Sequence, residues 1–484
     1  MKLGKRAVAL GLCAALALPL GACGGPARTA EPVALTVWSY YNGTQQQIFS
    51  ELVAEFNDTV GREKGIVVTA SSFGAVDDLG EKVDAALRGE VGADRPPDLF
   101  SAYADTAEAL DRDGFLADLT PYFTQEELAA YVPGYLEEGC LGGEKLKIFP
   151  VAKTTEMLFV NKTAWTPFAQ ATGASEEDLA TWEGITKLSR AYYEWTDGLT
   201  PNVPDDGSAF FGRDAFANYM LSGAHQLGSD LIRVEDGVGT VDLDPAVLRR
   251  LWDNYYVPYV NGWFTAYGNF RSDDMRTGMV AAYVGSGTSA AYFPDEVARD
   301  DGSTYPIEGA VYPLPGFAGG APLAVQQGAG IAVTKSDTRH EEAAVAFLKW
   351  FTQPEQNSGF SAASGYLPVM EREADAQSLA QAAQRYGQSL NGMQTESMLV
   401  GMEMARDYEP YLCPPFVNSA AVRRAIGASM PEQAAADRTL VEAAMAAGAS
   451  REEAVAPYLT DARFESWRQS FARAVERAEA GSPD

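Results

Sequence analysis

The sequence predicts an α/β fold divided between two lobes of unequal size. Apolar, strand-like runs alternate with amphipathic helical patterns, and this alternation builds parallel or mixed sheets. The chain is also long, because 462 residues remain after an N-terminal targeting segment at residues 1–22, which is too many for one small core. Ligand-binding groups are therefore expected at the carboxyl ends of the strands.

The targeting segment has the features of an export signal. Lys2, Lys5 and Arg6 form a positive region, and residues 7–20 form an apolar run too short to span a bilayer as a mature helix. A small residue pair precedes Cys23, a pattern that resembles the lipobox of bacterial lipoproteins. We expect lipidation of Cys23, a tether at 23–32, and a lipid anchor on the extracytoplasmic face of the cell membrane. A plain secretory signal and a short anchor helix are the alternatives.

Composition restricts the classes of partner. Removal of the three basic signal residues takes the net charge from −29 to −32, and such an acidic surface repels nucleic acids and anionic headgroups. His225 and His340 are far apart, so no metal site or cofactor is predicted. The mature chain keeps Cys140 and Cys413, which form either two separate thiols or one disulfide.

The first predicted elements form a β–α–β unit and its continuation. They are a strand at 33–38, a helix at 45–57, a strand at 65–70, a helix at 77–87 and a strand at 98–101. Aromatic and acidic side chains follow the first and the last of these strands. Because the carboxyl ends of parallel strands meet at one edge of a sheet, residues 38–41 and 103–105 are expected to border a cleft.

The remainder is mostly helical. Helix starts are expected at Asp214 and at Asp244-Pro245, where a capping carboxylate precedes a proline in the first turn. Strand patterns return at 279–284, 309–312 and 330–334, and a helix with one apolar face is expected at 340–352.

A set of short motifs recurs in a characteristic order. The motifs are Leu35-Thr36-Val37-Trp38-Ser39-Tyr40-Tyr41 with a helix ending at Asn57, Phe149-Pro150-Val151-Ala152 before Leu158-Phe159-Val160-Asn161-Lys162, residues 270–284 followed by Gly285-Ser286, residues 347–352, and Gly365-Tyr366-Leu367-Pro368. Together they resemble the family-1 extracellular solute-binding proteins of ABC importers, the maltose- and oligosaccharide-binding group. The resemblance covers nearly the whole mature chain.

The resemblance implies a type II periplasmic-binding-protein-like fold with a ligand cleft between its lobes. The N-lobe would comprise 33–152 plus 286–335, and the C-lobe 153–285 plus 336–484, with a helical C-terminal extension from about 395. It also implies a monomeric, non-catalytic receptor that closes around a carbohydrate and delivers it to the transmembrane subunits of an ABC permease.

The candidate ligand-binding residues combine aromatic faces with polar partners, as sugar sites require. Strand ends supply some of them, residue type supplies others, and the resemblance supplies the last three. They are Trp38, Tyr40, Tyr41, Tyr103 and Asp105; Arg213, Trp263 and Phe264; and Ser286, Gln327 and Tyr366. Ordinary core packing is the alternative for the aromatic residues.

Two other functions stay open. Arg213 and Arg271 could clamp a polyol phosphate or another small anion, unless they pair with the neighbouring acids Asp214, Asp273 and Asp274. No nucleophile elbow, phosphate-binding loop or His-Glu-x-x-His motif occurs, so an enzyme is not expected. A surface glycosidase with two carboxylates is the remaining catalytic alternative.

Overall fold

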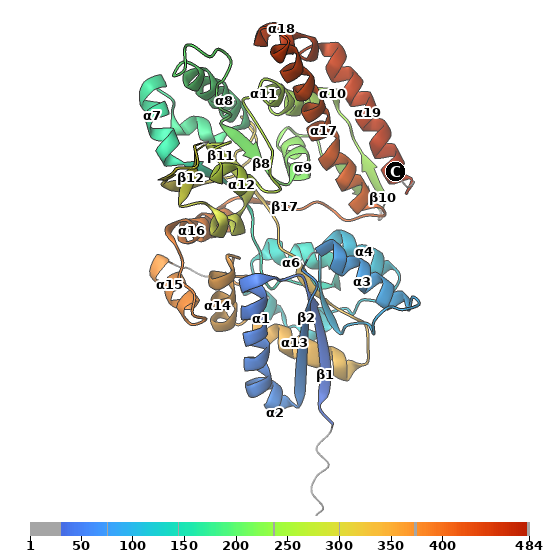
Figure 1. Cartoon of the computed structure of the whole chain (residues 1–484). Helices are drawn as coiled ribbons and strands as arrows, with labels where there is room; N and C mark the ends of the chain where they lie inside the picture. The colour runs from blue at the N-terminus through green and yellow to red at the C-terminus, as the bar shows by residue number, and fades with distance from the viewer. Residues whose placement is uncertain are drawn as a thin grey trace, which may run out of the picture.

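Two lobes, each with its own sheet and apolar core, make up the structure (Figure 1). The computed structural model describes residues 31–481 apart from 75, 144, 236–237, 300 and 372–374. The predicted export signal and Cys23 lie outside these residues. Within the described part of the chain, no helix combines the length and the apolar character needed to cross a membrane.

The first lobe is built on a five-stranded sheet in the order β2-β1-β3-β16-β6. β1 runs parallel to both β2 and β3, whereas β16 is antiparallel to β3 and to β6. Val33, Leu35 and Val37 of β1 are buried between exposed neighbours, which is the period of two expected of a strand. The strands are β1 (Val33–Ser39), β2 (Ile66–Ser72), β3 (Leu99–Ala102), β6 (Ile148–Phe149) and β16 (Gly330–Val333).

Helices from both ends of the sequence cover this sheet. The ring of Phe49 in α1 lies 5.6 Å from that of Phe351 and 6.3 Å from that of Phe360, so α1 shares a core with α13 and α14. The helices are α1 (Gly43–Phe56), α2 (Arg62–Lys64), α3 (Val76–Arg88), α4 (Ala104–Arg112), α5 (Gln125–Leu128), α6 (Pro133–Gly139), α13 (Thr338–Phe351), α14 (Pro354–Ser364) and α15 (Ala376–Gln384), with a hairpin of β4 (Cys140–Leu141) and β5 (Lys145–Leu146).

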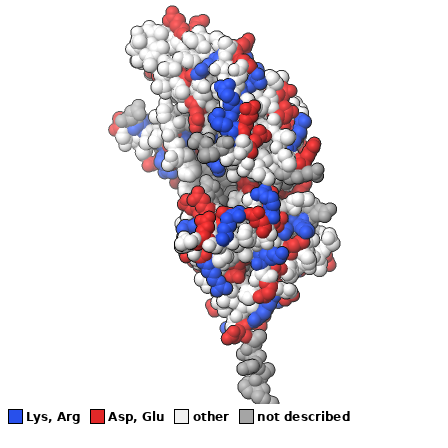
Figure 2. Space-filling view, turned by 90° about the vertical axis from the view of Figure 1, so that its right-hand side faces the viewer, with Lys and Arg blue, Asp and Glu red and all other residues white. Residues whose placement is uncertain are grey.

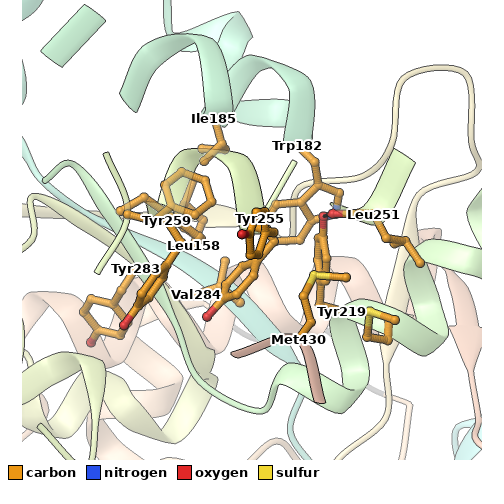
Figure 3. Packing of buried hydrophobic residues seen from close by; sticks show 14 of the residues in the cluster. Leu158, Trp182, Ile185, Tyr219, Leu251, Tyr255, Tyr259, Tyr283, Val284 and Met430 are labelled. Atoms are coloured by element: carbon orange, nitrogen blue, oxygen red, sulfur yellow. Dashed lines mark hydrogen bonds between the residues drawn. The ribbon is translucent and has the colours of Figure 1, made fainter. Parts of the chain in front are cut away.

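The second lobe is built on a four-stranded sheet in the order β14-β7-β11-β8. Every residue of β7 is buried, because helices and the neighbouring strands surround it. Trp182, Tyr219 and Tyr255 gather beside this sheet, and Figure 3 shows them with Leu251 and Met430. The strands are β7 (Glu156–Asn161), β8 (Phe211–Arg213), β11 (Ala282–Ser286) and β14 (Gly309–Pro313), with hairpins of β9 (Ile232–Glu235) with β10 (Val238–Val241) and β12 (Glu296–Ala298) with β13 (Thr304–Pro306).

The C-terminal helices belong to the core of the second lobe. α17 and α19 lie side by side in Figure 1, and the ring of Trp467 in α19 lies 4.9 Å from that of Trp252 in α10. The helical C-terminal region predicted from the sequence is therefore present as an integral part of this lobe. The helices are α7 (Lys162–Thr172), α8 (Trp182–Asp197), α9 (Phe216–Gln226), α10 (Pro245–Asp253), α11 (Tyr256–Val260), α12 (Arg271–Arg276), α16 (Gly392–Asp407), α17 (Ser419–Ala446), α18 (Arg451–Val455) and α19 (Asp461–Glu479).

Crossing segments pair with one another where the lobes meet. The backbone of Thr154 pairs with that of Gln327, and the backbone of Lys153 pairs with that of Leu367. β15 (Leu323–Val325) runs parallel to β17 (Glu409–Tyr411) in the same region. These pairings join three passages of the chain at the hinge.

The arrangement differs from the expected lobe boundaries at two places. Residues 286–335 were assigned to the first lobe, but β14 pairs with β7 in the second sheet. Residues 336–484 were assigned to the second lobe, but α13 and α14 pack against the first. A helix pattern reveals that one face is buried, but not which sheet covers it.

Candidate ligand-binding cleft

Three tyrosines from separate elements meet at the edge of the first lobe. Tyr40 follows β1, Tyr103 follows β3 and Tyr366 follows α14. The hydroxyl oxygens of Tyr40 and Tyr366 are 3.1 Å apart, and the backbone N–H of Ala329 donates to the Tyr40 hydroxyl at 3.3 Å. Burial raises the pKa of all three well above 10. The hydroxyls of this tyrosine cluster therefore stay protonated, and each can both donate and accept hydrogen bonds.

A buried carboxylate organises the facing edge of the second lobe. Glu156, the first residue of β7, accepts hydrogen bonds from Arg213 Nη2 and from Asn218 Nδ2, both at 2.9 Å. Gln327 Nε2 donates to the same carboxylate at 3.4 Å. The side chains of Glu156 and Arg213 are each only 1% exposed, so the two charges compensate each other inside the protein. We refer to these four residues as the Glu156 network.

Residues 327–329 connect the two groups. Gln327 reaches the Glu156 network, Gly328 accepts a hydrogen bond from Lys153 Nζ at 2.7 Å, and Ala329 bonds to Tyr40. Gly328 has a φ of +90°, and a Cβ atom there would lie 2.6 Å from the carbonyl oxygen of Ala152. Only glycine fits this close passage, which keeps the tyrosine cluster and the Glu156 network next to each other.

Two polar atoms of the network remain unpaired. Arg213 Nη1 and Gln327 Oε1 are buried and have no hydrogen-bond partner within the described residues. Leaving a buried polar group unpaired costs about 1–3 kcal/mol, so the site is stabilised by a molecule that supplies a partner. Because both side chains bond to the carboxylate of Glu156, a donor and an acceptor are offered at one place.

Family comparison assigns this architecture. Residues 51–386 match the description "Bacterial extracellular solute-binding protein". The chain belongs to this family. The resemblance predicted from the sequence is thereby confirmed at the level of the family. No curated protein matches the chain in sequence.

Solved structures share the fold of this solute-binding protein. A cyclic alpha-maltosyl-1,6-maltose binding protein from Arthrobacter globiformis matches with a TM-score of 0.64 and 18% identity, covering 93% of this chain and 100% of its own. UgpB from Mycobacterium tuberculosis, in complex with glycerophosphocholine, gives 0.63 and 19%, covering 93% and 99%. The sugar-binding protein MalE from Xanthomonas citri gives 0.63 and 17%, covering 92% and 98%. The predicted two-lobe α/β fold is confirmed.

Asp105 and Ser286 lie near the same boundary between the lobes. Asp105 is in the first turn of α4, a helix that lies against α17 of the second lobe. Burial raises the pKa of Cys413, and the charge of Asp105 adds to that effect, which places Asp105 near the segment that leads into α17. Ser286 ends β11, and its Oγ lies 3.1 Å from that of Thr288 and 3.5 Å from that of Thr154.

Two candidate aromatic residues of the first lobe are part of its core. Trp38 is buried with its ring 4.9 Å from that of Phe73. Tyr41 is fully buried between Phe49 and Phe360, at 5.2 Å from each ring, and its hydroxyl has no partner among the described residues. Tyr41 supports the tyrosine cluster from behind, because its ring also contacts that of Tyr40 at 5.2 Å.

Two candidate aromatic residues of the second lobe contact other parts of that lobe. The guanidinium of Arg190 lies 5.7 Å from the ring centre of Trp263. Phe264 is buried, with its ring 4.8 Å from that of Phe211. The density of aromatic residues between 252 and 267 thus reflects packing around Tyr255 and its neighbours.

The two arginines differ in their partners. Arg271 pairs with Asp214 and Asp274, so its charge is compensated by neighbouring acids, as the alternative interpretation held. Arg213 pairs with Glu156 instead, and only its Nε reaches Asp214, through the backbone carbonyl at 3.0 Å. Arg271 is therefore held in an ion-pair cluster, whereas Arg213 keeps one free donor among the described residues.

Three polar residues of this region were not anticipated. Glu156 and Asn218 belong to the Glu156 network, and Arg423 in α17 donates to Asn218 Oδ1. Glu156 could have been found from the sequence, because it is a single acidic residue directly before the apolar run of β7. Asn218 and Arg423 carry no such signal, since each lies on a helix with polar neighbours.

Surface charge and metal-binding groups add little to this picture. Acidic and basic side chains are interspersed over both lobes on the face shown in Figure 2, and a hollow separates the lobes at mid-height. Among the described residues, no cluster of three or more His, Cys, Asp or Glu side chains could hold a metal ion. Cys140 and Cys413 are both free thiols, so the disulfide considered from the sequence is not formed.

Proposed function

We propose that this solute-binding protein captures a carbohydrate, an oligosaccharide or a sugar derivative, between its lobes. The observation that carries the proposal is the position of the tyrosine cluster beside the Glu156 network, with Arg213 Nη1 and Gln327 Oε1 unpaired among the described residues. A polyhydroxylated solute supplies both donors and acceptors to such a site. The named relatives that bind maltose derivatives support this class of ligand.

The electrostatic character of the site favours a neutral ligand. Glu156 neutralises Arg213, and the tyrosine hydroxyls are uncharged because their pKa values are raised by burial. A neutral site discriminates little by charge and relies on hydrogen-bond geometry and on aromatic faces. These are the properties that suit a sugar ring, which has apolar faces and hydroxyl edges.

A second candidate ligand is a polyol phosphodiester. The specific observations in its favour are the unpaired Nη1 of Arg213 and the proximity of Arg423, which bonds to Asn218. UgpB, a structure of the same fold, holds glycerophosphocholine. A phosphodiester oxygen would bond to Arg213 Nη1, and its affinity would fall as the salt concentration rises.

Capture is followed by delivery in this proposal. Lipidation of Cys23 keeps the protein at the extracytoplasmic face of the membrane, and the closed, monomeric form presents the solute to an ABC permease. A solute that contacts both lobes stabilises the closed form by its differential affinity for the two states. The protein acts without catalysis, since the carboxylate of Glu156 is engaged by three donors and is poorly suited to transfer a proton.

Thermal unfolding against a panel of ligands tests the proposal. The mature chain is titrated with mono-, di- and oligosaccharides, polyols and glycerophosphodiesters. A ligand at about 100 times its Kd adds about 2.7 kcal/mol to the free energy of unfolding, which gives a clear rise in Tm. A rise with one neutral sugar family, recovered unchanged afterwards, supports the carbohydrate receptor. A rise only with phosphodiesters supports the second candidate, and hydrolysis of the sugar would contradict a binding role.

A further inference from the structure

A second hollow, of about 940 Å³, lies at the hinge. Its walls come from both lobes: α6 packs on β6 of the first sheet, whereas α16 packs on β14 of the second. Figure 1 places α6 at the upper edge of the first lobe and α16 at the lower edge of the second. The crossing residues 154–155, 324–326 and 367–368 close the hollow between these two helices.

The crossing segments separate this hollow from the proposed solute site. Thr155 and Gln326 line the hollow, whereas the next residue of each segment, Glu156 and Gln327, belongs to the Glu156 network. Successive side chains of an extended segment point to opposite faces, which explains this division. No residue of the tyrosine cluster or of the Glu156 network lines the hollow. An occupant of the hollow would therefore leave the solute site free.

The lining is mainly apolar and contains one unsatisfied polar group. Apolar side chains from both lobes form most of the wall, among them Tyr135, Leu367, Met370, Leu399 and Met402. Methionine side chains adapt to ligands of different shape. Thr155 is 3% exposed, and its Oγ1 has no hydrogen-bond partner within the described residues. A buried hydroxyl of this kind provides a single polar anchor in an apolar cavity.

The rim of the hollow restricts the charge of its occupant. Glu371 and Glu403 line it and are exposed, and the protein as a whole is strongly acidic. Arg406, which also lines it, pairs with Asp407. Anions are thus disfavoured at this opening.

We propose that the hinge hollow is a second binding site, for an uncharged and largely apolar small molecule whose one polar group bonds to Thr155 Oγ1. The volume of the hollow suits a molecule of ten to twenty heavy atoms, an order of magnitude typical of small-ligand pockets. An occupant contacts α6 and α16 at once, so its affinity depends on the angle between the lobes. This last step rests on the proposed function: the occupant and the solute then change each other's affinity by the same factor.

N-phenyl-1-naphthylamine tests the site without any solute. It is uncharged, has an aromatic body and one N–H group, and its fluorescence rises when it enters an apolar cavity. The expected result is a saturable, single-site rise with the wild-type protein. Ala405→Trp, which places an indole in the hollow, should weaken binding at least tenfold. The matched control is Ala435→Trp in α17, which lines a separate hollow of about 430 Å³ within the second lobe and should leave the affinity within twofold.

A smaller variant tests the polar anchor. Thr155→Val keeps the shape of the side chain and removes the hydroxyl, so the probe should bind about three- to tenfold more weakly. Met402→Trp replaces Ala405→Trp if the latter does not fold, as judged by circular dichroism. Equal affinity in the wild type and the tryptophan variant, or no saturable rise in the wild type, would overturn the proposal. Because no solute is used, these outcomes are independent of whether the cleft binds a carbohydrate.

Discussion

The hydroxyl oxygens of Tyr40 and Tyr366 lie 3.1 Å apart although 326 positions separate the two residues. Tyr40 comes from the end of the first strand, and Tyr366 comes from the turn after α14, once the chain has built most of the second lobe and returned. The pair therefore marks the place where the first lobe is completed. The solute site proposed above is built on this pair.

We predict that Tyr366→Phe weakens solute binding while leaving the fold intact. The hydroxyl of Tyr366 contributes one hydrogen bond, worth about 0.5–1.5 kcal/mol, so Kd should rise about two- to tenfold in calorimetric titration. Tyr41→Phe is the matched control, because the Tyr41 hydroxyl is buried without a partner in the described structure and removing it should leave Kd unchanged. A larger effect of Tyr41→Phe than of Tyr366→Phe would contradict the assigned site.

We predict that Glu156→Gln destabilises the protein strongly. The substitution leaves Arg213 as a buried charge without its anionic partner, which costs about 3–5 kcal/mol of the free energy of unfolding. Urea denaturation measures this loss. Glu176→Gln serves as the control, because Glu176 pairs with Lys162 at the surface with half of its side chain exposed, and a surface pair contributes about 0–1 kcal/mol. Equal losses from the two variants would refute the buried role of Glu156.

We predict that His225 makes stability depend on pH. Burial opposes its charged form, but hydrogen bonds and charge attraction from Asp230 and Glu409 outweigh burial and raise the pKa of His225 above 6.5. A raised pKa in the folded state adds stability that is fully present below the unfolded pKa near 6.5 and is lost as the pH rises through the folded pKa.

The check compares Tm of the wild type and His225→Gln between about pH 5.5 and about pH 8. The advantage of the wild type should be largest at the acidic end and should shrink toward the alkaline end. A difference that grows with pH would show that the sign is wrong.

We predict that Trp467→Ala destabilises the second lobe by about 3–5 kcal/mol, because it empties a buried space between α10, α17 and α19. Leu440→Ala in α17 is the control, since Leu440 is 54% exposed and its truncation should change the free energy of unfolding by less than about 0.5 kcal/mol. Denaturation by urea distinguishes the two. A negligible effect of Trp467→Ala would mean that the C-terminal helices are dispensable for this core.

Local patterns were enough to predict the first β–α–β unit and the place of Tyr40 and Tyr103. Strand alternation and the apolar face of α1 are encoded over a few residues, and parallel strands bring their carboxyl ends together. Tyr366 entered through the family resemblance, since nothing near it in the sequence points to Tyr40. The bond between the two depends on a long-range return of the chain.

Partners of buried charges were harder to predict. The acids nearest Arg213 in sequence suggested Asp214, but the carboxylate that pairs with it is Glu156 on another strand. Phe264 and Trp263 were considered for the cleft because aromatic residues are dense there, yet density is equally produced by a large core. In both cases the deciding information is which elements pack together, and single-sequence periodicity does not contain it.

The order of strands in the first sheet has a consequence for synthesis. β3 is paired on one side by β1 and on the other by β16, and β16 follows β7, β8, β11 and β14 along the chain. As the chain leaves the ribosome, one edge of β3 stays unpaired until nearly all strands of the second lobe have been made, and such edges invite aggregation. Neither sheet is finished much before the other, so the polypeptide folds late and as a whole, and a chain released early would lack a complete lobe.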